Sequence, residues 1–129
     1  MSEGAVRKSG IFFAHEVARK SQVEMISDGI DTLTEGGFLL AAAPTGIGKT
    51  AAALASALQA SFDNNLATEK PKIIFMTGRQ SQHRIVVDTV RQINSRIPEG
   101  IPKITLIDII GREGMCEYCL LYTSPSPRD

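Results

Sequence analysis

Three stretches of the chain repeat apolar residues at intervals of three and four, the period of a helix with one buried face. They run from Glu16 to Glu35, from Lys49 to Phe62 and from Ser81 to Ile97. Gly36 and Gly37 end the first stretch, and a proline follows the third. The pattern predicts three helices, with these residues on their buried faces: Val23, Ile26, Ile30, Leu33, Leu54, Leu58, Phe62, Val86, Val90, Ile93 and Ile97.

Three short apolar runs lie between and after these helices. They are Phe38 to Ala43, Lys72 to Thr77 (KIIFMT) and Lys103 to Ile110 (KITLIDII). Runs of this length suit central strands that are covered on both faces. Alternating strands and helices build a parallel sheet with right-handed crossovers. We therefore expect an α/β fold in which helices flank a parallel sheet.

Composition limits the class of protein more than its function. With 129 residues, 43% apolar content and a formal net charge of zero, the chain suits one modest domain or part of a larger one. Zero net charge gives no sign of a stand-alone nucleic-acid binder. No apolar run approaches the roughly 20 residues that span a bilayer, and the start lacks the apolar core of a signal peptide. We expect a cytoplasmic protein, or a nuclear one in a eukaryote, with no membrane partner.

The most specific motif is APTGIGKT, between the first apolar run and the second helix. Two glycines let the backbone turn tightly, so that its N–H groups and the helix N-terminus face phosphate oxygens. The lysine reaches the β- and γ-phosphates of ATP, and the following hydroxyl ligates Mg²⁺. A glycine-rich turn that binds nothing is the alternative. We predict that the nucleotide contacts Ala43, Pro44, Thr45, Gly46, Ile47, Gly48, Lys49 and Thr50, of which Lys49 and Thr50 are the catalytic candidates and Thr50 the Mg²⁺ ligand.

The chain offers no acidic motif to complete this site. Asp108 is the only acid in the third apolar run, and no glutamate adjoins it. Hydrolysis needs a further carboxylate on the metal side and a residue that orients water. The sequence therefore predicts ATP binding without unaided turnover.

Four stretches, in order, resemble the N-terminal part of the XPD-like iron–sulfur DNA helicases of superfamily two, a group that includes the DinG and FANCJ relatives. They are FFAHEVARKSQVEM, APTGIGKT, MTGRQSQ and GREGMC. The resemblance implies that residues 1–118 are the first, truncated part of a RecA-like motor domain. The complete protein would couple ATP hydrolysis to translocation on single-stranded DNA.

The resemblance also implies roles for particular residues. Arg19 and Gln22 would belong to the nucleotide site, where Gln22 helps to recognise adenine. Thr77, Arg79 and Gln82 would lie along single-stranded DNA, although Gly78 interrupts the family pattern there. Cys116 would be the first ligand of a [4Fe–4S] cluster in the full-length protein.

The last residues, CLLYTSPSPRD, resemble the translation of a transposase adapter used for sequencing libraries. We therefore expect residues 119–129 to be a non-native tail, and the C-x-x-C formed by Cys116 and Cys119 to be accidental.

Other interpretations stay open from the sequence. The chain could belong to a different P-loop ATPase or kinase, or to a nucleotide-binding module that never hydrolyses. Arg19 and Gln22 could be ordinary solvent-facing residues. Ser81 could cap the third helix, and His83 is expected at the surface.

Overall fold

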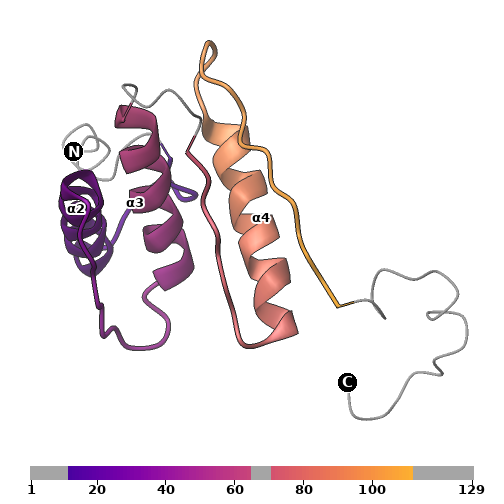
Figure 1. Cartoon of the computed structure of the whole chain (residues 1–129), viewed down its shortest axis with the longest axis horizontal. Helices are drawn as coiled ribbons and strands as arrows, with labels where there is room; N and C mark the ends of the chain where they lie inside the picture. Colours follow the sequence, from indigo (N-terminus) through magenta and orange to yellow (C-terminus); the bar gives the residue numbers. More distant parts are fainter. Residues whose placement is uncertain (1–11, 65–70, 112–129) are drawn as a thin grey trace, which may run out of the picture.

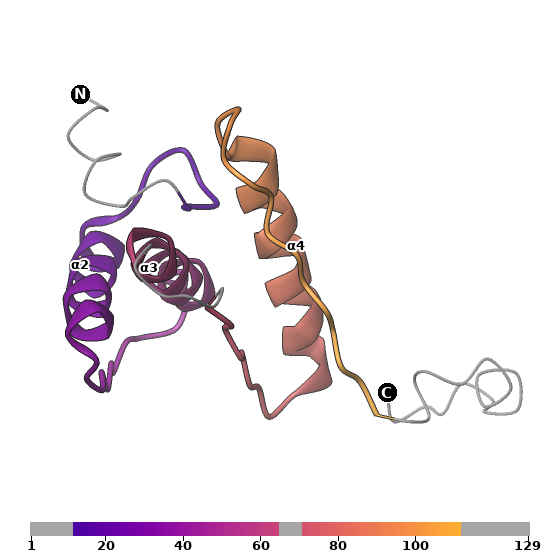
Figure 2. The same cartoon turned by 45° about the horizontal axis from the view of Figure 1, so that its top comes forward.

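The computed structural model describes residues 12–64 and 71–111 of the chain. It contains three α-helices, α2 (Lys20–Glu35), α3 (Lys49–Asp63) and α4 (Gln80–Arg96). α2 and α3 pack side by side, and α4 contacts α3 over a shorter stretch (Figures 1 and 2). The three predicted helices are confirmed, although α2 begins at Lys20 and not at Glu16.

Local sequence explains where the helices stop. Gly36 ends α2 in the left-handed conformation (φ 80°), which costs glycine little, and its N–H donates to the Leu33 carbonyl. Ile97 ends α4 in an extended conformation (φ −62°, ψ 127°). Pro98 follows it, and the residue before a proline is disfavoured in a helix.

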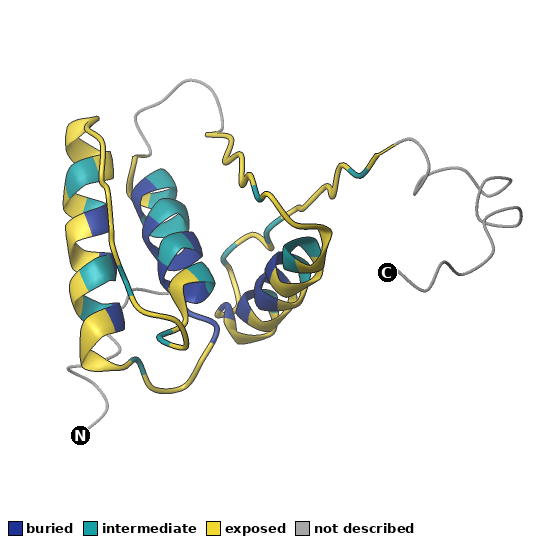
Figure 3. Ribbon diagram, turned by 90° about the horizontal axis from the view of Figure 1, so that it is seen from below, coloured by how far each residue is buried: buried dark blue, intermediate teal, exposed yellow. Residues whose placement is uncertain are grey.

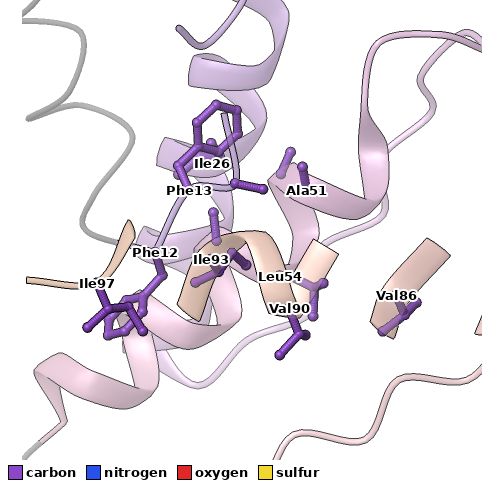
Figure 4. Close-up of a cluster of buried hydrophobic side chains, with 12 residues drawn as sticks. Phe12, Phe13, Ile26, Ala51, Leu54, Val86, Val90, Ile93 and Ile97 are labelled. Carbon is purple, nitrogen blue, oxygen red and sulfur yellow. The ribbon is translucent and has the colours of Figure 1, made fainter. Parts of the chain in front are cut away.

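The core lies where the three helices face one another and the segment that precedes α2. Figure 3 shows buried residues on the facing sides of the helices and exposed residues on their outer sides. The Phe12 and Phe62 rings meet edge to face, with centroids 5.5 Å apart. Figure 4 shows this cluster, whose buried members are Phe12, Phe13, Ala14, Ile26, Ala51, Ala52, Leu54, Ala55, Val86, Val90, Ile93 and Ile97.

Small residues bring α2 and α3 close together. A Cβ atom added at Gly29 would lie only 2.7 Å from the Ser56 Cβ atom. The contact therefore needs glycine at this position. The buried face of α2 consists of Gln22, Ile26 and Gly29, whereas Leu33, which we expected in the core, is 45% exposed.

The described residues contain no β-strand, so the predicted α/β fold with a RecA-like parallel sheet is wrong and the class is all-α. The runs 38–43, 72–77 and 103–110 are extended, but no ladder of backbone hydrogen bonds joins them. Instead, 72–77 leads to the turn before α4, and 103–110 runs back along α4 (Figure 1). Apolar content predicted burial for these runs, yet Phe38 and Leu40 are fully exposed.

Exposure alternates along the second run. Ile73 and Phe75 are each 40% exposed, whereas Ile74 and Met76 are 83% and 86% exposed. Successive side chains of an extended backbone point to opposite sides. One side of this run is therefore partly covered, and the other is open.

No helix in the described part of the chain is long and apolar enough to cross a membrane. The predicted tail, residues 119–129, lies outside the described residues, as does the end of the predicted domain after residue 111.

Candidate nucleotide site

The loop 43–50, which carries the APTGIGKT motif, leads directly into α3. Gly46 and Gly48 both adopt positive φ angles, 84° and 78°, which glycine tolerates far better than other residues. Lys49 is the first residue of α3, and no side chain caps this helix. The N–H groups in the first turn of a helix lack intrahelical partners and can bind an anion.

The start of α2 lies against this loop. The Arg19 guanidinium donates from Nη1 to the Gly46 carbonyl at 2.6 Å. The Gln22 amide donates from Nε2 to the Gly48 carbonyl at 3.3 Å. Phe12 and Phe13 are buried in the core, which fixes the segment that enters α2. The structure thus brings both residues of the R-x-x-Q motif to the loop.

Gln22 is only 4% exposed, so the interpretation of this residue as solvent-facing is wrong. Its Oε1 accepts a hydrogen bond from the Arg19 backbone N–H at 3.0 Å. This contact is half of a capping box at the start of α2. Both ends of the amide are therefore engaged within the protein. Arg19 itself is exposed, which agrees with the alternative that it is a solvent-facing residue.

Lys49 is folded back over the loop. Its Nζ donates to the Ala43 carbonyl at 3.0 Å. The Thr50 side chain is half-buried, and its hydroxyl has no hydrogen-bond partner within the described ranges. Pro44 and Thr45 are exposed. The loop thus leaves a cation and a hydroxyl at the start of α3 that a phosphate and its metal could engage.

Residues predicted to contact DNA lie at the start of α4. The Thr77 hydroxyl donates to the Arg79 carbonyl at 3.1 Å. Arg79 precedes α4 at the N-cap position, so the alternative in which Ser81 caps this helix is wrong. Thr77 and Arg79 line one cavity of about 290 Å³, whereas Gln82 does not. The cavity is lined by Thr77, Gly78, Arg79, Gln80, His83, Ile109, Ile110 and Gly111.

His83 is paired and not a simple surface residue. Its Nδ1 lies 2.6 Å from Oδ1 of Asp108, and both side chains are partly exposed. The pair joins α4 to the third extended run. Asp108, the only acid in the run 103–110, therefore has a partner on α4. No sequence motif signals this contact, because it depends on where the run 103–110 lies.

Asn94 holds the same run near its start. Its Oδ1 accepts from the Ile104 N–H at 2.8 Å, and its Nδ2 donates to the Ile104 carbonyl at 3.0 Å. The Asn94 amide thus pairs with both backbone groups of Ile104, as the backbone of a neighbouring strand would. The run is therefore pinned to α4 at two places, Asn94 and His83.

Replacing Asn94 with alanine is expected to release the start of this run. Loss of two partly buried hydrogen bonds should lower the free energy of unfolding by about 1–2 kcal/mol. Hydrogen exchange at the Ile104 amide should become faster, because that N–H loses its acceptor. Ser95→Ala, on the exposed face of the same helical turn, is the control. Unchanged exchange at Ile104 would contradict the role given to Asn94.

The described residues contain no group of three or more His, Cys, Asp or Glu side chains that could hold a metal ion. Cys116, the predicted cluster ligand, lies outside the described residues. Comparisons with protein-family models, with curated proteins and with solved structures found no match.

Proposed function

We propose that the chain binds ATP with Mg²⁺ through residues 43–50 and the start of α2. One observation carries this proposal. Arg19 and Gln22, which are 27 and 26 positions from their partners, both donate to carbonyls of a glycine-rich loop that opens a helix. Two side chains at the start of α2 thus hold the backbone of a loop that precedes a helix N-terminus, the place where phosphates bind in proteins.

The proposed roles follow from the chemistry of each group. The free N–H groups at the start of α3 would surround the phosphates. Lys49 would leave the Ala43 carbonyl for the β- and γ-phosphates, and the Thr50 hydroxyl would ligate Mg²⁺. Bound Mg²⁺ neutralises charge that develops on the phosphates. The residues present fit this group, because a cation and a free hydroxyl adjoin the loop.

We further propose that the chain is the ATP-binding part of an ATP-dependent helicase that acts on single-stranded DNA. The order of the four sequence motifs supports this proposal. Thr77 and Arg79, which share a cavity, would contact the strand together with Gln82. The [4Fe–4S] cluster with Cys116 as a ligand stays a prediction for the full-length protein.

A second candidate function for the chain is that of a module that binds ATP and does not hydrolyse it. Asp108 supports this alternative, because its hydrogen-bond partner is His83 and not a residue of the loop. Without a carboxylate at the metal, water attack on the γ-phosphate is not assisted.

Calorimetric titration tests the proposal. Mg-ATP should bind saturably, whereas AMP, which lacks the β- and γ-phosphates, should bind far more weakly. The chain alone should release no phosphate from ATP above the rate in buffer. Equal affinity for ATP and AMP, or no binding of ATP, would overturn the assignment of the loop.

A further inference from the structure

We propose that Gln22 is a positioning residue for the phosphate loop and does not read the nucleotide base. The inference rests on the proposed nucleotide site, and it assigns to Gln22 a contact with the protein's own backbone. The alternative is the adenine contact that the sequence resemblance implies.

Both functional groups of the Gln22 amide are already used. Oε1 accepts from the Arg19 N–H, and Nε2 donates to the Gly48 carbonyl. The side chain is buried. One Nε2 hydrogen and one Oε1 lone pair remain, but the side chain is only 4% exposed, so a nucleotide base has little access to them.

The Gly48 carbonyl is a point where two helices are joined. It also accepts from the Ala52 N–H at 3.1 Å, the first backbone hydrogen bond of α3. Gln22 therefore ties the start of α2 to the start of α3 through one oxygen atom. This contact fixes the loop just where the phosphate-facing N–H groups begin.

Steric fit supports the same role. A Cβ atom at Gly48 would overlap Nε2 of Gln22. The amide thus lies directly against the Gly48 backbone. Gly48 is needed both for its positive φ angle and for this close approach.

A ligand without a base separates the two roles. Mg-ATP, Mg-GTP and Mg-tripolyphosphate are each titrated into the parent chain and into Gln22→Met. Methionine is uncharged and similar in length, so it adds no repulsion toward phosphate. If Gln22 positions the loop, all three affinities should fall by about the same factor, five- to tenfold, which corresponds to one lost hydrogen bond.

Gln92→Met is the matched control, because Gln92 is exposed on α4. It should leave all three affinities unchanged. A loss confined to ATP, with tripolyphosphate binding unchanged, would overturn the positioning role and support adenine recognition. If Gln22→Met does not fold, Gln22→Asn, which keeps the amide but is too short to span both contacts, takes its place.

A ligand-free measurement keeps this inference separate from the proposed function. ¹⁵N relaxation should show more motion at Gly46 and Gly48 in the Gln22 variant than in the parent, with unchanged motion in α4. Equal loop motion in both chains would overturn the inference. Failure of the parent to bind any of the three ligands would instead overturn the nucleotide site.

Discussion

Replacing Lys49 with alanine is expected to weaken Mg-ATP binding by about ten- to one hundredfold. A hydrogen bond between an ammonium group and a phosphate is charge-assisted, and its loss costs about 1.5–3 kcal/mol. The fold should survive, because Lys49 is exposed and its hydrogen bond to the Ala43 carbonyl lies at the surface. Calorimetry gives the affinity, and thermal unfolding tests whether stability is kept.

Lys72→Ala is the matched control, since it removes the same charge from an exposed position on the second extended run. It should leave ATP affinity within about twofold of the parent, because an isolated surface charge interacts weakly across water. Equal losses of ATP affinity in the two variants would show that binding depends on the total positive charge of the protein and not on Lys49 in particular. No loss in Lys49→Ala would contradict the assignment of the loop. In the full-length helicase that we propose, the same substitution should abolish DNA-stimulated ATPase activity.

Replacing Ile93 with alanine is expected to lower the free energy of unfolding by about 2–5 kcal/mol. Ile93 is fully buried in the core, and truncating such a side chain removes apolar contacts and leaves a cavity. Urea denaturation followed by circular dichroism measures the change.

Ile85, on the same helix but 46% exposed, provides the comparison. Ile85→Ala should cost much less, roughly 0.5 kcal/mol. Similar losses at the two positions would mean that the interior face of α4 is not the one described.

The helices could be predicted from the sequence, whereas the absence of paired strands from the described residues could not. Apolar spacing on α4 placed Val86, Val90, Ile93 and Ile97 in the core, where they lie. The spacing of apolar residues shows which face of a helix is buried, and a helix forms its backbone hydrogen bonds within itself. An unbroken apolar run such as 72–77 gives no information on which segment would supply its hydrogen bonds. The backbone of this run forms no ladder with another segment among the described residues, and every side chain from Lys72 to Met76 is exposed.

Parts of the candidate site could likewise be predicted from the sequence, and other parts could not. The loop 43–50 could be found because its residues are contiguous and its glycines have a backbone role. Arg19 and Gln22 lie against this loop, and their roles in nucleotide binding stay predictions. The His83–Asp108 pair and the Asn94 contacts could not be predicted, because both depend on the path of 103–110 along α4.

The most direct test of the account is a titration of Mg-ATP into ¹⁵N-labelled chain, with the backbone amides observed by NMR. The amides of Gly46, Gly48, Lys49 and Thr50 should shift in a saturable manner, since their N–H groups would meet the phosphates. Mg-tripolyphosphate should shift the same amides in the same direction. Unchanged loop amides at millimolar Mg-ATP, or shifts confined to residues outside the loop and the start of α2, would contradict the proposal that this protein binds nucleotide phosphates at residues 43–50.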